Sequence, residues 1–185
     1  MTWLWIVIGI AVVLLVLLAY LFNRIVRLRN EVSTGWSNID VQLKRRNDLI
    51  PNLVEAVKGY AAHERGVFEE VTAARAAMAN ASSPAAAGAA DSLLGQALGK
   101  LFAVAEAYPD LKASTNFLQL QSELTDTEDK IAAARRYYNA TVLAYNNATQ
   151  TFPSLLIAGT AGFRAREFFA ADQSERGPVA VSFAS

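Results

Sequence analysis

Cysteine is absent from this chain of 185 residues, and histidine occurs only once. Without cysteine, disulfide bonds, thiol catalysis and cysteine-bound zinc are excluded. The single histidine, His63, is followed four residues later by Val67, so the two-histidine helix of zinc proteases is excluded as well. One histidine also cannot supply the paired Glu-x-x-His motifs of di-iron bundles. No serine, threonine or lysine has a recognisable catalytic partner.

Net charge and strand patterns are also missing. The 17 basic residues are balanced by 17 acidic ones, and no long basic run occurs. Nucleic acid is therefore not an expected partner. No alternating pattern of useful length precedes the C-terminal tail, and glycine-rich phosphate loops need a preceding strand. The sequence predicts an all-α protein.

One long apolar run is present at the start, from Trp3 to Phe22, and it contains no charged side chain. Twenty residues at a helical rise of about 1.5 Å span roughly 30 Å, the thickness of the hydrocarbon core of a bilayer. Aromatic residues lie at both of its ends, where they favour the headgroup boundary. We interpret the run as a single transmembrane helix that uses the lipid bilayer as its partner.

A cleaved signal peptide is the competing interpretation. It requires basic residues before the apolar run and a small-residue cleavage site after it, and neither is present. The basic residues instead follow the run, as Arg24, Arg27 and Arg29 and then as Lys44, Arg45 and Arg46. The positive-inside rule therefore favours an external N-terminus and a cytoplasmic domain in the cell membrane.

Apolar residues at spacings of three and four predict several helices after the anchor. A first helix continues from the anchor to about residue 47, and a second apolar stripe reaches Met78. The expected remainder is a loop at Ala79–Ala90, a short helix at Asp91–Ala107, a turn at Asp110–Thr115 and a long helix at Asn116–Thr151 that ends before Phe152-Pro153. Apolar residues of the tail are expected to cover the end of the domain, namely Leu155, Leu156, Ile157, Phe163, Phe168 and Phe169. We divide the chain into an anchor at 1–22, a helical domain at 23–170 and a loosely ordered tail at 171–185.

Pro51 is the ambiguous point in this pattern. Proline lacks the N–H of a helix interior and disfavours helical geometry in the residue before it. We therefore expect two helices joined by a tight turn near residues 47–50. The alternative is one kinked helix, because the apolar rhythm from Ile39 to Val57 is not reset at the proline.

Several motifs in order resemble the LemA family. They are GWSNIDVQLKRRNDLIPNLVEAVKGYAAHE at Gly35–Glu64, EAYPDLKAS at Glu106–Ser114, LQSELTDTEDKIAAARRYYNATVLAYN at Leu120–Asn146, FP at Phe152-Pro153 and GF at Gly162-Phe163. The resemblance implies a bacterial membrane protein with one N-terminal transmembrane helix followed by an antiparallel four-helix bundle. It implies no cofactor and no known reaction, and one branch of the family is associated with the magnetosome membrane.

Nine polar residues of the helical domain form the candidate partner surface, and two of them, Arg46 and Arg135, lie near the apolar stripes. They are Arg45, Arg46, Asp48, His63, Glu64, Glu128, Arg135, Asn139 and Asn146. Arginines can form forked hydrogen bonds with the carboxylates or phosphates of a partner. We favour the structural alternative, in which Arg46 and Arg135 pair with acids such as Glu64 or Glu128 on neighbouring helices. Tyr138 and Tyr145 are expected in the core.

Three functions stay open at this stage. The favoured one is a non-enzymatic scaffold that binds another membrane or envelope protein, with homo-oligomers possible. The second is a metal-binding or enzymatic bundle built on Glu64, Glu106, Glu123 and Glu128. The third is membrane remodelling, with the arginines on anionic lipid and the apolar tail at Leu155–Phe163 lying on the bilayer.

Overall fold

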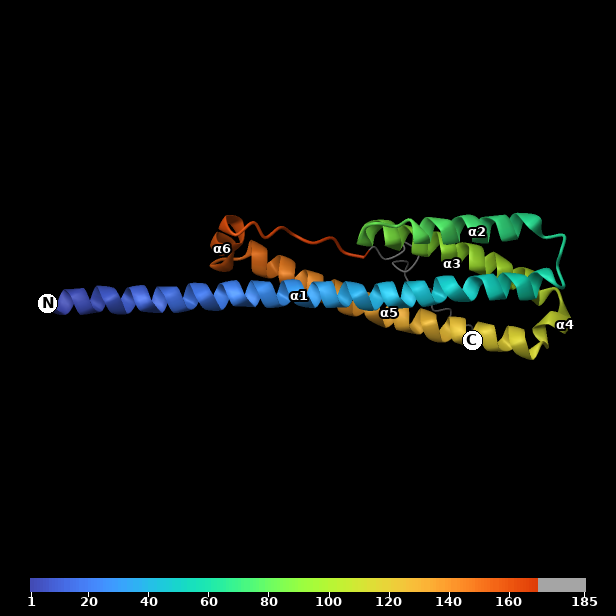
Figure 1. Cartoon of the computed structure of the whole chain (residues 1–185), viewed down its shortest axis with the longest axis horizontal. Coiled ribbons are helices and arrows are strands. Elements are labelled where there is room, and N and C mark those ends of the chain that lie inside the picture. Colours follow the sequence, from blue (N-terminus) through green and yellow to red (C-terminus); the bar gives the residue numbers. More distant parts are fainter. Residues whose placement is uncertain (170–185) are drawn as a thin grey trace, which may run out of the picture. The chain divides into compact units, whose positions relative to one another are not determined.

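The structure is a computed structural model that describes residues 1–169. Over this range the chain forms helices and no strand, which confirms the all-α prediction. The helices are α1 (Thr2–Lys58), α2 (Arg65–Ala79), α3 (Pro84–Glu106), α4 (Pro109–Lys112), α5 (Thr115–Gln150) and α6 (Ser154–Thr160) (Figure 1). The tail expected at 171–185 lies outside the described residues.

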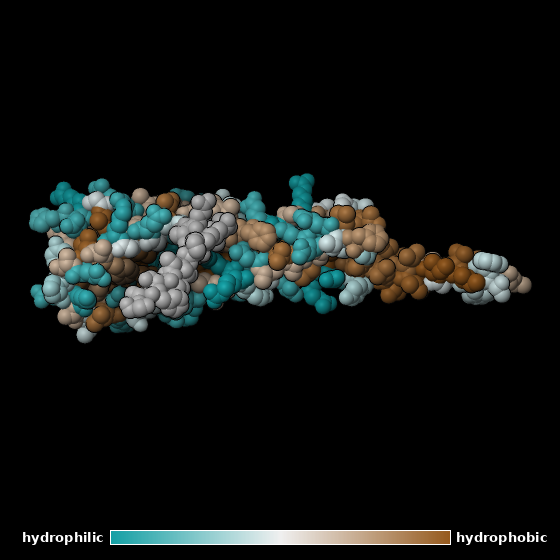
Figure 2. Space-filling model, turned by 180° about the vertical axis from the view of Figure 1, so that it is seen from behind, coloured by the Kyte–Doolittle hydropathy of each residue, from teal (hydrophilic) through white to brown (hydrophobic). Residues whose placement is uncertain are grey.

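The N-terminal part of α1 is the apolar run of the sequence, and its side chains are exposed. By length and composition this part can cross a membrane, and only 6% of its most apolar window is buried. Figure 2 shows it as an almost continuous hydrophobic surface. A core helix of a soluble protein buries such residues, so their exposure fits contact with lipid.

The prediction of two helices joined near residues 47–50 is wrong, because α1 continues through Pro51 to Lys58. In a regular helix, the N–H of residue 51 would donate to the carbonyl oxygen of Asn47, and proline leaves that oxygen free. The side chain of Arg75 on α2 replaces the missing donor, since its Nε donates to Asn47 O at 3.2 Å. The helix instead ends at Lys58, and α2 begins at Arg65. The predicted apolar stripe that reaches Met78 is therefore divided between two helices.

The loop expected at Ala79–Ala90 is much shorter than predicted, because α3 already begins at Pro84. Ser83 is its N-cap, and its Oγ accepts a hydrogen bond from Ala86 N at 3.1 Å. Proline suits the first turn of a helix, and alanine is the best helix former. These local signals outweigh the apparent linker composition. The expected turn after Pro109 contains the short helix α4, and α5 agrees with its predicted bounds to within one residue.

The chain divides into two compact units. The core unit contains residues 40–133 together with Phe168 and Phe169, and the anchor unit contains residues 1–39 and 134–167. In the core unit, one cluster of buried apolar side chains draws on α1, α2, α3, α4 and α5. Its fully buried members include Val57, Val71, Leu94, Leu101 and Leu111.

The anchor unit contains the first part of α1, the last part of α5 and α6. Gly35 of α1 faces α5 so closely that an added Cβ would lie 3.3 Å from the Cα of Tyr138. The rings of Trp36 and Tyr138 lie beside this contact, with centroids 5.9 Å apart. Tyr138 and Tyr145 are both buried, which confirms their predicted core role.

Candidate functional site

The most buried charged group in the core unit is Arg46 of α1. Its side chain is 2% exposed, and its guanidinium group forms ion pairs with Asp91 of α3 and Glu128 of α5. The contact between Arg46 Nη1 and Glu128 Oε1 is 2.6 Å long, and Nη2 donates to Asp91 Oδ1. This polar triad joins three helices through one side chain.

The predicted pairing of Arg46 with Glu128 is confirmed, whereas Asp91 was missed. Asp91 was assigned only as the first residue of a helix. It lies inside α3, and its buried neighbours along the helix are Ala87, Ala90 and Leu94. The sequence did contain a signal for this pairing, because Asp91 is a lone acid on the apolar face of its helix. A buried carboxylate at such a position needs a cationic partner. The triad fixes the pairing of helices more than it adds net stability.

The other polar residues of this region do not join the triad. Arg45 Nη1 lies 3.9 Å from Asp126 Oδ2. The pKa of Asp126 is lowered by its hydrogen bond with Lys130 and by the positive charges of Lys130 and Arg45. Asp48 is exposed on α1. His63 and Glu64, which were expected in a helix, are exposed in the connection between α1 and α2.

The four glutamates of the carboxylate hypothesis do not converge. Glu64 and Glu106 are exposed, whereas Glu123 and Glu128 are half-buried on α5 and Glu128 is held by Arg46. Among residues 1–169, no group of three or more histidine, aspartate or glutamate side chains is placed to hold a metal ion. The buried carboxylate Asp91 is held by an arginine instead.

Asn146 of α5 has a role that the sequence did not reveal. Its side-chain amide pairs with the backbone of Arg166, with Nδ2 donating to Arg166 O at 2.9 Å and Oδ1 accepting from Arg166 N at 2.8 Å. Tyr138 Oη donates to Glu167 O at 2.8 Å, and burial raises the pKa of this phenol. The two side chains fasten the segment after α6 to α5. Arg135 and Asn139 are half-buried on the same helix.

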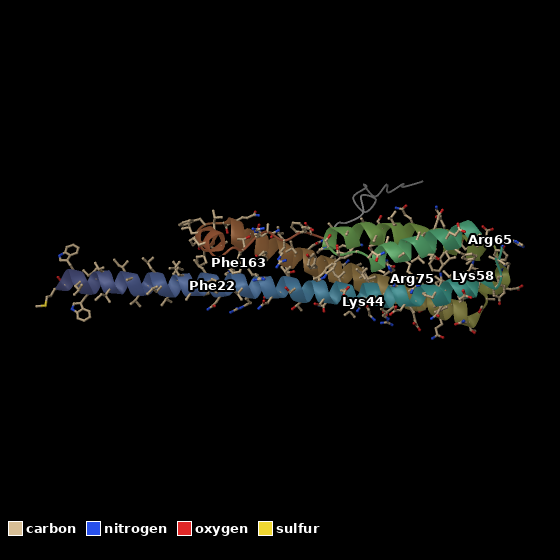
Figure 3. All side chains as sticks on the ribbon, turned by 45° about the horizontal axis from the view of Figure 1, so that its top comes forward. Phe22, Lys44, Lys58, Arg65, Arg75 and Phe163 are labelled. Carbon is tan, nitrogen blue, oxygen red and sulfur yellow. The ribbon has the colours of Figure 1, made fainter. Side chains whose placement is uncertain are left out.

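The chain reverses direction around α6, so that the following segment runs opposite to α5 (Figure 1). Gly162 has a φ of 73°, and Phe163 N donates to Ala158 O at 3.0 Å, as in a Schellman cap. The reversal places the ring of Phe163 beside Phe22, with centroids 5.7 Å apart (Figure 3). Leu155 and Leu156 of α6 are exposed. Of the last two described residues, Phe169 is buried and Phe168 is exposed.

A shallow groove lies between α2 and α3 in the core unit. It has a volume of about 360 Å³ and is lined by Ala73, Ala77, Leu93 and Gln96, with Glu70 and Lys100 among its polar residues. Glu70 and Lys100 form an exposed ion pair of 2.6 Å. The neighbouring α3 surface contains Gly95 and Gly99, and a Cβ added at either would meet no atom within 4 Å.

Comparison with known proteins identifies the family. The LemA family profile matches residues 35–183. Magnetosome protein MamQ of Magnetospirillum gryphiswaldense is 27% identical over 80% of this chain, which spans 64% of that relative, less than two thirds of its length. Protein LemA of Metamycoplasma hominis is 29% identical, over 86% of this chain and 74% of the relative. The family profile covers most of this helical chain, which therefore belongs to the LemA family.

Proposed function

We propose that this protein is a membrane-anchored interaction protein without a catalytic reaction, and that a helix of its partner packs on the exposed face of α3. The observation that carries the proposal is the pair Gly95 and Gly99. Both lie in the interior of a helix of 23 residues, one turn apart and exposed. The spacing is that of the G-x-x-x-G motif, which lets two helix backbones approach closely.

These glycines have no role in the packing of the described residues. Each lowers helix stability by roughly 1 kcal/mol relative to alanine, and a Cβ at either position would lie in open space. A close approach at Gly35 explains why that glycine is needed inside the fold, whereas Gly95 and Gly99 have no such neighbour among residues 1–169. A partner helix packed on this face would explain why glycine occupies both positions.

The surface around the two glycines has the composition of a contact face. Most exposed residues of α3 are small or apolar. Between Pro84 and Ala105, Lys100 is the only charged residue that is exposed. Leu93 is 53% exposed beside the groove of α2 and α3. Depletion of charge with retained apolar area distinguishes the centre of an interface from the rest of a surface.

Crosslinking from the groove tests this proposal in the full-length protein in cell membranes. We would place a photoreactive residue at Gln96, which lines the groove, and at the exposed Gln121 of α5 as the reference position. We expect one discrete adduct from Gln96 and none from Gln121. The pair Gly95→Leu and Gly99→Leu should abolish the adduct, because leucine keeps the backbones apart.

Gly66→Leu is the matched control, since Gly66 is an exposed helical glycine with equally open surroundings on α2. The adduct should persist in this variant. Equal crosslinking from Gln96 and Gln121, or an adduct that survives both leucines on α3, would contradict the proposed face.

The topology is a second part of the proposal. We propose an external N-terminus and a cytoplasmic core unit, because the arginines follow the apolar span. The chain has no cysteine, so Ser82→Cys in the exposed connection before α3 introduces a unique thiol. It should resist a membrane-impermeant maleimide in intact cells and react after lysis. Labelling in intact cells would place the core unit outside.

A further inference from the structure

Positive charge is concentrated in the anchor unit. Residues 1–39 and 134–167 contain seven arginines and only two acidic residues, Glu31 and Glu167, although the whole chain has equal numbers of basic and acidic residues. The arginines are Arg24, Arg27, Arg29, Arg135, Arg136, Arg164 and Arg166. The unit that carries the membrane anchor is therefore strongly basic.

Three of these arginines line one pocket. Arg29 of α1 and Arg164 and Arg166 of the segment after α6 surround a volume of about 370 Å³, together with Tyr145 and Gly162. No carboxylate of residues 1–169 forms an ion pair with these three guanidinium groups. Like charges that lie close together repel one another, and an anion in the pocket would reduce that repulsion.

The backbone holds the arginines in place without help from their charges. The Gly162 reversal and the contact between Phe163 and Phe22 fix one end of the segment. Asn146 holds both backbone groups of Arg166 at the other end. The backbone that carries Arg164 and Arg166 is therefore held before any ligand arrives, which reduces the entropy lost on binding.

The pocket lies close to the lipid headgroup layer that is expected beyond the end of the apolar run. Phe22 ends the apolar run, and Arg29 follows seven residues later on the same helix, roughly 10 Å further at about 1.5 Å per residue. The headgroup layer extends roughly 5–8 Å beyond the hydrocarbon core on each side. Phe163, which lines the pocket, contacts Phe22 itself, and Leu155 and Leu156 of α6 are exposed just before it.

We propose that this pocket binds the phosphate group of an anionic phospholipid, through forked hydrogen bonds from Arg29, Arg164 and Arg166. Guanidinium groups suit phosphate oxygens because two parallel N–H donors match two oxygens. The site is separate from the α3 face, so it orients the protein at the membrane whether or not that face has a partner. Free phosphate offers the same chemistry, but the depth of the pocket favours the lipid.

Native mass spectrometry of the full chain in neutral detergent tests this site. The protein is titrated with an equimolar mixture of dioleoyl phosphatidylglycerol and dioleoyl phosphatidylcholine, and bound lipid is identified by mass. We expect selective retention of phosphatidylglycerol. The variant R29Q/R164Q/R166Q should lower its affinity at least roughly tenfold, because it removes several charge-assisted hydrogen bonds. R29Q alone, on a different element from the other two, should lower it by a smaller factor.

The control variant R24Q/R27Q/R136Q removes the same charge from the same unit at exposed positions outside the pocket. Its selectivity should match that of the unchanged protein, and circular dichroism of all variants should be the same. Equal loss in both triple variants would show general attraction and overturn the site. Displacement of phosphatidylglycerol by excess potassium phosphate would assign the pocket to free phosphate and overturn the lipid as its source.

Discussion

Arg75 Nε donates to the carbonyl oxygen of Asn47, the oxygen that Pro51 leaves without its helical partner. The bond is 3.2 Å long and joins α2 to α1 at the point where a proline interrupts the hydrogen-bond ladder. It explains how a helix of 57 residues continues through a proline. The side chains of this region are shown in Figure 3, where Arg75 is labelled.

Arg75→Met should lower the free energy of unfolding by about 1–3 kcal/mol, because a half-buried carbonyl loses its donor. Pro51→Ala supplies an N–H for the same oxygen. In the Pro51→Ala background, Arg75→Met should therefore have a much smaller effect. Denaturant unfolding of the four proteins in detergent gives the coupling energy, and additive effects of the two changes would show that the two sites are independent.

Arg46→Met should destabilise the core unit by about 3–5 kcal/mol, because it removes the cation that pairs with the buried carboxylate of Asp91. Replacing the whole triad, with Asp91→Leu and Glu128→Met added, should restore most of this loss. The same unfolding measurement compares the single and triple variants. A triple variant less stable than Arg46→Met would show that the three side chains hold the core by more than charge pairing.

The long helices and the anchor could be predicted because their signals are local. The apolar period defines α5 to within a residue, and an uncharged run defines the anchor. The continuity of α1 could not be predicted, since it depends on Arg75, which lies 28 residues from Asn47 in sequence. The antiparallel four-helix arrangement implied by the family resemblance stays a prediction.

The candidate site was partly predictable for the same reason. Arg46 was recognised by its place beside an apolar stripe, and Glu128 was named among its possible partners. Asp91 was missed because the predicted helix began at Asp91, whereas α3 begins at Pro84. Asn146 was noted only as a candidate partner-surface residue, and its function depends on the chain reversal at Gly162. Charge segregation into the anchor unit was hidden by the neutral total.

Tyr138 should make stability depend on alkaline pH. Its pKa in the folded protein is raised from 10.0, mainly by burial, so the folded state keeps a proton that the unfolded state releases. The stabilisation is complete below pH 10 and is lost as the pH rises through the folded pKa. Tyr138→Phe should lower stability by about 1 kcal/mol at neutral pH, since the bond to Glu167 O is lost. The difference between the two proteins should shrink above pH 10, and a constant difference would contradict the assigned role.

Substitution of glycine by alanine should have opposite effects at two places on the chain. At Gly95 and Gly99, alanine should raise the free energy of unfolding by roughly 1 kcal/mol each, because nothing lies within 4 Å of the added methyl group. At Gly35, the methyl group would lie 3.3 Å from the backbone of Tyr138, and overpacking costs about 1–3 kcal/mol. Denaturant midpoints of the three variants measure the signs. If the alanine substitutions at Gly95 and Gly99 raise stability and also weaken the Gln96 crosslink, the two glycines lower the stability of the fold but permit contact with the partner. The requirements of folding and of partner binding would then differ at these two positions.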